Sequence, residues 1–145
     1  MKSILTGLSF LCSLMVFAQS HDQILSNLEK EEAKFSDIAL TIWDYAEMGY
    51  QEEQSSALLQ KTLQEEGFTI EKGVAGIPTA FVAEYSNGKG PVIAILGEYD
   101  ALPGLSQKAV SYKVSNGKRA GHACGHHLFG TASAAAAISI KKYIA

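Results

Sequence analysis

Hydrophobic residues between Asp22 and Met48 recur at steps of three, four or seven positions, which is the spacing of one face of an α-helix. The charged stretch Glu29–Lys34 interrupts this pattern without ending it. Ser20, with Gln23 three positions later, fits a capping box at the start, and Gly49 follows as a residue that can end the helix. The pattern predicts a first amphipathic helix over Asp22–Met48.

Two further stretches have helical character. Glu52–Glu66 carries Leu59 and a second leucine four positions on, and Gly67 stands where a helix C-cap glycine is expected. Leu128–Ile144 is rich in alanine, and the small residues between Ala132 and Ala137 would let this helix approach a sheet closely. Both stretches are predicted to be helices.

The period changes to two in the middle of the chain. Thr79–Tyr85 alternates in the manner of a half-buried strand, and Asn87-Gly88 is a hairpin-turn signal. Val92–Leu96 is a continuous apolar run, as expected for a strand that is buried on both faces. Leu105–Gly121 is polar and irregular, which predicts a loop. This loose alternation of helices and strands indicates an α/β layer architecture.

The first residues have the layout of a secretory signal peptide. Lys2 supplies a positive start, Ile4–Phe17 is uncharged and apolar, and cleavage is expected after Ala18. The apolar run is short for a membrane span, which needs about 20 residues. We therefore expect a signal peptide over residues 1–18 and an exported, periplasmic or secreted protein without a membrane segment after cleavage. A retained anchor, or a lipid anchor at Cys12, is the alternative.

The charge of the chain excludes one class of partner. The net charge is −3 and the pI is about 5.8, so there is no basic field to attract nucleic acid or an anionic membrane. With 47% hydrophobic and 19% charged residues, the composition is that of an ordinary globular domain. We expect no nucleic-acid partner.

The first group of residues with chemical potential is Gly97–Gly104, which follows the predicted buried strand Val92–Leu96. Ligands of open α/β sheets bind beyond the carboxyl ends of strands, so Asp100 is placed to act there. The alternative is that Asp100 caps a turn before Pro103. Glu98 is two positions from Asp100 and its role is ambiguous, although we expect regular alternation to point it to the opposite face of the strand.

The second group is Gly121–His127, which holds three histidines and the cysteine Cys124 at the start of the last predicted helix. Cys12 lies in the predicted signal peptide, so Cys124 would have no partner for an internal disulfide after cleavage. Thiolate and imidazole are ligands that zinc prefers, which makes Cys124 and His126 a candidate pair of metal ligands. Two alternatives remain: a nucleophilic Cys124 with a histidine base, or a chance cluster in a polar turn.

Taken together, these motifs are familiar. GEYDALPGLSQ (Gly97 to Gln107) and GHACGHH (Gly121 to His127), with weaker agreement around Ile42-Trp43 and Gly67-Phe68, resemble the amidohydrolase branch of the aminoacylase and glutamate-carboxypeptidase metallopeptidases. The resemblance implies part of a two-metal catalytic domain over residues 19–145, with a mixed sheet flanked by helices. It also implies two divalent ions (Zn, Mn or Co) and a lid or dimerisation domain that is inserted later in the chain.

The resemblance assigns roles to single residues. Cys124 and His126 match the thiolate and imidazole metal ligands of the family. Asp100 matches a carboxylate that orients those ligands without being counted among them. His127 stands where this branch usually has Asn or Asp, which raises the possibility of an extra ligand. The role of His122 is not assigned.

The implied reaction is metal-assisted hydrolysis of the amide bond of an N-acyl amino acid or a dipeptide, with a small molecule as substrate. In the family, the general-base glutamate and further ligands lie downstream of the region matched here. We therefore expect the 145-residue chain to be an incomplete portion that is inactive alone, and the full-length protein to be a homo-oligomer or a paired subunit. The alternative is a non-catalytic metal- or ligand-binding module derived from the same fold.

Overall fold

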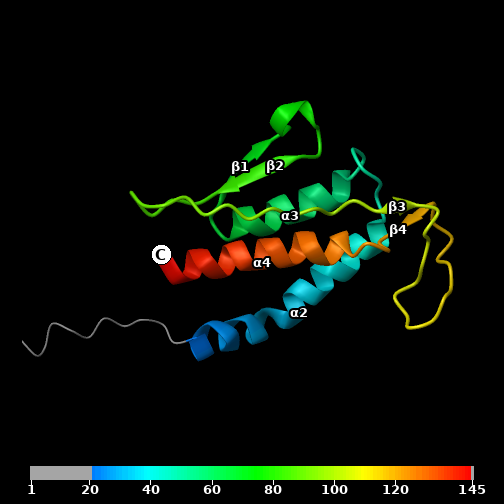
Figure 1. The fold of residues 1–145 in the computed structure, drawn as a ribbon, viewed down its shortest axis with the longest axis horizontal. Coiled ribbons are helices and arrows are strands. Elements are labelled where there is room, and N and C mark those ends of the chain that lie inside the picture. Colours follow the sequence, from blue (N-terminus) through cyan, green and yellow to red (C-terminus); the bar gives the residue numbers. More distant parts are fainter. Residues whose placement is uncertain (1–20, 145) are drawn as a thin grey trace, which may run out of the picture.

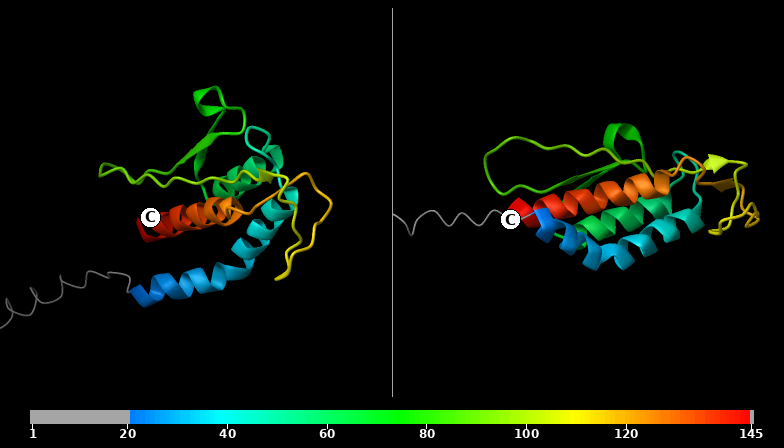
Figure 2. Two further views of the ribbon diagram at one scale, coloured as in Figure 1. Left: turned by 45° about the vertical axis from the view of Figure 1, so that its right-hand side comes forward. Right: turned by 60° about the horizontal axis from the view of Figure 1, so that its bottom comes forward.

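The computed structural model of the protein describes residues 21–144. The predicted signal peptide, the capping residue Ser20 and Cys12 lie outside these described residues. The elements are α2 (His21–Tyr45), α3 (Glu53–Glu65), β1 (Thr69–Lys72), η1 (Val74–Gly76), β2 (Phe81–Glu84), β3 (Leu102–Pro103), β4 (Ala120–Gly121) and α4 (His126–Ile144). Helices α2, α3 and α4 lie side by side, and the β1–β2 hairpin with the extended segment that follows it lies on one face of this layer (Figures 1 and 2).

The three helices are held together by the apolar stripes that their sequences predict. The buried core contains Ile38 and Ile42 from α2, Leu59 and Leu63 from α3, and Ala134 and Ile138 from α4, together with Phe68. Full burial of an Ile or Leu side chain contributes about 1.5–3 kcal/mol, so this core is the main source of stability in the described residues. All three predicted helices are confirmed.

The ends of the helices differ in how well the sequence predicted them. Helix α3 ends in a Schellman motif, because Gly67 has a φ of 87° while its N–H reaches the carbonyl of Gln64 and Phe68 reaches Leu63. Helix α2 ends at Tyr45 and not at Met48, because Ala46 already adopts a left-handed φ of 50°. The expectation that Gly49 ends this helix was therefore wrong.

The sequence predicted only one strand, β2, of the β1–β2 hairpin. The strands pair antiparallel with Thr69 opposite Glu84 and Lys72 opposite Phe81, which confirms the centre of the predicted strand Thr79–Tyr85. Strand β1 was missed because Thr69–Lys72 has a single apolar residue and no alternating pattern. The connection between the strands runs through η1, and its N-cap Gly73 and its residues Ala75 and Gly76 have positive φ.

The predicted buried strand Val92–Leu96 is wrong. These residues form an irregular extended segment, in which the exposed fraction is 94% for Val92 and 73% for Leu96. Asn87-Gly88 does not join two paired strands either. A strand needs a neighbour to satisfy its backbone groups, and among residues 21–144 no strand pairs with this run.

The fold class is α/β in its coarse form, with three helices and two small antiparallel sheets among the described residues. The second sheet pairs Leu102 with Gly121 and closes the base of the predicted loop. That loop is confirmed except for strand β4. Within residues 21–144, none of the helices combines the length and hydrophobicity of a membrane span.

Candidate metal centre

Three side chains meet beside the first turn of α4. His126 Nδ1 lies 2.8 Å from Asp100 Oδ1, and His126 Nε2 lies 3.0 Å from Glu98 Oε2. The ligand atoms of the three residues all lie within 4.8 Å of one another. The exposed fractions of the side chains are 24% for His126, 31% for Asp100 and 48% for Glu98, so the group is open to solvent on one side. An imidazole between two carboxylates is a donor set that suits a divalent cation.

His126 is positioned by a tight turn that leads into α4. The N–H of Gly125 reaches the carbonyl of His122 at 3.1 Å, and Gly125 has a φ of 81°, which glycine adopts without strain. The carbonyl of Gly125 then accepts hydrogen bonds from Leu128 and Phe129. The turn therefore places the His126 side chain at the very start of the helix.

The two carboxylates come from the segment that precedes β3, and this segment is held closely against α4. Ser133 Oγ donates a hydrogen bond to the carbonyl of Leu96 at 2.6 Å. A Cβ atom added to Gly130 would lie 2.7 Å from the carbonyl oxygen of Glu98, and one added to Gly97 would lie 3.1 Å from Ser133 Cβ. Only glycine at position 130 permits this approach, so the helix fixes the backbone on which Glu98 is mounted.

The other side of the same segment is anchored to the rest of the fold. Tyr99, between the two carboxylates, donates its hydroxyl to the carbonyl of Thr79 and stacks on Phe81. Burial raises the pKa of Tyr99, so it remains a neutral hydrogen-bond donor. The N–H of Ala101 reaches the carbonyl of Glu47 at 2.7 Å. Asp100 is thus flanked on both sides by residues with fixed partners.

The structure brings together two of the three residues that the sequence singled out, Asp100 and His126. Cys124 is exposed in the preceding turn and is not among the residues whose ligand atoms meet within 4.8 Å, so its ligand role stays a prediction. Glu98 was expected on the opposite face but lies on the His126 side. That expectation was wrong because residues two positions apart in an extended chain point to the same side, as Glu98 and Asp100 do.

His122 and His127 form a buried layer behind His126. His122 Nε2–H donates to the carbonyl of Ile42 at 3.0 Å, and the His127 ring packs edge-on against Trp43 with ring centroids 4.8 Å apart. Burial lowers the pKa of His122, and burial together with the neighbouring His122 lowers the pKa of His127 to about 4. Both rings are therefore neutral at pH 7, and His127 is not in the group formed with Asp100.

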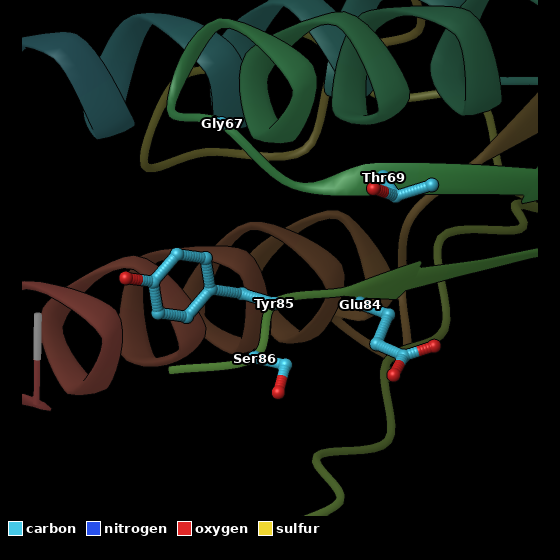
Figure 3. Close-up of a pocket in the computed structure, with 5 residues that line it drawn as sticks. All are labelled: Gly67, Thr69, Glu84, Tyr85 and Ser86. Carbon is cyan, nitrogen blue, oxygen red and sulfur yellow. The ribbon is translucent and has the colours of Figure 1, made fainter. Parts of the chain in front are cut away.

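A separate hollow of about 440 Å³ lies beside the hairpin, away from these histidines. It is lined by Gly67, Thr69, Glu84, Tyr85 and Ser86. Figure 3 shows Thr69 on one strand and, at the end of the other, Glu84 and Ser86 pointing away from it. Glu84 is the one ionisable carboxylate in this lining, and the lining contains no histidine or cysteine. The hollow therefore lacks the convergent donors of the His126 site.

Comparison with known proteins places these observations in a family, although no protein-family model matches the chain. The chain is 47% identical over 120 residues to a subunit of the p-aminobenzoyl-glutamate hydrolase of Escherichia coli (strain K12), covering 81% of this chain and 24% of that protein. It is 33% identical over 106 residues to thermostable carboxypeptidase 1 of Saccharolobus solfataricus, covering 72% of this chain and 26% of that protein. It is also 30% identical over 125 residues to N-acetyl-L-cysteine deacetylase of Bacillus subtilis, covering 86% and 29%.

The matches cover most of this chain but only about a quarter of the length of the curated relatives. The relatives belong to the family that the motifs at Gly97–Gln107 and Gly121–His127 resemble, and these motifs build the His126 site. The chain belongs to the amidohydrolase branch of the aminoacylase and glutamate-carboxypeptidase metallopeptidase family.

Proposed function

We propose that the protein is a metal-dependent amidohydrolase that hydrolyses the amide bond of an N-acyl amino acid or a dipeptide. The observation that carries this proposal is the His126 imidazole between the carboxylates of Asp100 and Glu98 at the start of α4. The relatives support it, because their names describe a hydrolase of p-aminobenzoyl-glutamate, a carboxypeptidase and a deacetylase of an N-acetyl amino acid.

The donor set fits a divalent cation of the zinc, manganese or cobalt group. Asp100 contacts Nδ1 of His126, and Nε2, on the side of the more exposed Glu98, is the nitrogen that we propose to bind metal. We propose His126 and Cys124 as ligands of one of two ions, with Asp100 orienting the ring. A bound divalent ion supplies a water of lowered pKa and polarises the scissile carbonyl.

The residues of this chain have three tasks in that proposal. Asp100 contacts Nδ1 of His126 and fixes the direction of the ring. The buried pair His122 and His127, packed against Trp43, closes the rear of the site and excludes water there. Glu98 adds a negative charge on the open side, where a cation and its substrate would enter.

The test uses the protein encoded by the full reading frame. It is freed of metal, reloaded with manganese, zinc or cobalt, and assayed against p-aminobenzoyl-glutamate, N-acetyl amino acids and dipeptides. We expect turnover that a chelator abolishes and that His126→Ala lowers by several orders of magnitude, while Glu71→Gln on strand β1 retains it. Metal binding without turnover of any amide would favour the non-catalytic module instead.

We also propose export and pairing. The expected signal peptide would leave Gln19 as the first residue of the mature protein, and N-terminal sequencing of the native protein checks this. An N-terminus at Met1 would contradict it. Pairing is proposed because a relative is named as one subunit of a hydrolase, and the mass of the native protein in solution measures it.

A further inference from the structure

We infer that Glu98 is a direct ligand of the divalent ion on the Nε2 side of His126, whereas Asp100 on the Nδ1 side only orients the ring. This inference rests on the proposed metal-dependent function. It separates two carboxylates that stand two positions apart in the sequence and contact the same imidazole.

The first step is the difference between the two sides of the His126 ring. Asp100 Oδ1 lies 2.8 Å from Nδ1 and its side chain is 31% exposed, whereas Glu98 Oε2 lies 3.0 Å from Nε2 and its side chain is 48% exposed. A histidine that ligates a metal through one ring nitrogen usually donates the N–H of the other to a supporting carboxylate. The less exposed Asp100 suits that supporting role, which leaves the more open Nε2 side for the ion.

The second step is the spacing on the Nε2 side. Glu98 Oε2 lies 3.0 Å from Nε2. Zinc binds nitrogen and oxygen at about 2.0–2.2 Å, so two donors on one ion lie roughly 3.0 Å apart at a right angle and roughly 3.4 Å apart at the tetrahedral angle. The pair already has the separation that two ligands of a single ion need, with a small movement at most.

The third step is the environment of Glu98 compared with the structural carboxylates of the chain. Glu52 is buried and accepts a hydrogen bond from Thr79, and Glu47 accepts from the Ser55 backbone and hydroxyl. The Glu98 side chain contacts His126 and is about half exposed. Its backbone is nevertheless fixed, because Gly130 packs against its carbonyl. A fixed backbone with a solvent-facing carboxylate suits a ligand that receives an ion from solution.

The experiment measures cobalt binding to the metal-free protein encoded by the full reading frame, by calorimetry and by visible absorption. Asp100→Asn retains an oxygen that accepts from Nδ1 and should weaken cobalt binding by roughly 10–100-fold, as changes in supporting partners do. Glu98→Gln removes a charged donor and should exceed that loss, with a changed cobalt spectrum, while Glu98→Asp restores part of the affinity. Glu71→Gln, an exposed carboxylate changed in the same way on β1, should bind as the unaltered chain does.

The outcomes separate this inference from the proposed function. Cobalt binding that is lost in His126→Ala but unchanged in Glu98→Gln would overturn the role of Glu98 and leave the metal site standing. Failure of the unaltered full-length protein to bind cobalt would overturn both. Far-ultraviolet circular dichroism checks that each variant is folded, and retained binding in a folded Glu98→Ala variant would also overturn the inference.

Discussion

The helical layer and the extended segment 86–96 both contain apolar residues, but these side chains are buried in the helices and exposed in the segment. Ile42, Leu59 and Ile138 are fully buried between helices, whereas Val92, Ile93 and Leu96 are exposed. A helix makes its backbone hydrogen bonds within itself, so it only has to pack its apolar face against another element. An extended segment needs neighbouring strands for both purposes, and the described residues offer it none.

The candidate site lies where these two regions join. The segment becomes fixed at Leu96, through Ser133, and remains fixed as far as Ala101, through Glu47. The two carboxylates stand in this fixed stretch. The order of the site therefore derives from the helices, although two of its three residues lie outside them.

The largest effect is expected from a truncation in the helical core. Ile42→Ala removes a fully buried side chain and should lower the free energy of unfolding by about 2–5 kcal/mol. Urea denaturation followed by circular dichroism measures the change. The helical layer would not be the main source of stability if Ile42→Ala unfolded at the same urea concentration as the unaltered chain.

The next prediction concerns the contact that joins the two regions. In Gly130→Ala the new Cβ would lie 2.7 Å from the Glu98 carbonyl, which should cost about 1–3 kcal/mol and displace Glu98. Helix propensity alone would favour alanine by about 1 kcal/mol, so the two effects have opposite signs. Thermal denaturation and cobalt affinity measure both consequences, and a more stable variant with full cobalt affinity would contradict the close approach.

A smaller, pH-dependent effect is expected at Glu47, between α2 and α3. Burial raises its pKa, but hydrogen bonds from Gln54 and Ser55 outweigh burial, and the net pKa is lowered. A carboxylate with a lowered folded-state pKa stabilises the fold above its unfolded pKa, and this contribution is lost as the pH falls through the folded pKa.

Glu47→Gln should therefore cost about 1 kcal/mol at pH 7, after allowance for solvent screening, and almost nothing at pH 2. Denaturation curves of both proteins at several pH values test this. A difference in stability that stayed the same at pH 7 and pH 2 would show that the charge of Glu47 is not involved.

The smallest effect is expected in the extended segment. Val92→Ser should change the free energy of unfolding by less than about 0.5 kcal/mol, because the side chain is already exposed. It should also reduce self-association, since exposed apolar side chains on an unpaired segment promote it. Denaturation and sedimentation at several protein concentrations check the two expectations, and a loss comparable with that of Ile42→Ala would remove the contrast between the regions.

The sequence predicted those features whose cause is local. The helices followed from apolar spacing, and the Schellman end of α3 followed from Gly67. The motif that contains Asp100 and the motif that contains His126 predicted a shared site, and the contact between the two side chains is present.

The features that the sequence did not predict depend on contacts between distant segments of the chain. Val92–Leu96 has the composition of a buried strand, but no pairing strand is present among the described residues. Glu98 was assigned to the wrong face although side chains two positions apart in an extended chain point to the same side, so it belonged with Asp100. The close contact of this backbone with α4 at Gly97 and Gly130 was not predicted, because such an approach between distant glycines leaves no periodic signal in the sequence.

The short β3–β4 ladder has a consequence for how this protein can diversify. The ladder pairs Leu102 with Gly121, and the N–H of Gly104 reaches the carbonyl of Arg119. The two ends of the loop between Gly104 and Arg119 are therefore held together, and we call this pairing the clamp. A Cβ on Gly121 would lie 1.9 Å from the Leu105 carbonyl, which makes this clamp intolerant of larger side chains. Doubling the length of a flexible loop costs only about 0.6 kcal/mol. Residues 108–118 can therefore accept insertions during evolution or engineering while Asp100 and His126, on either side of the clamp, keep their separation.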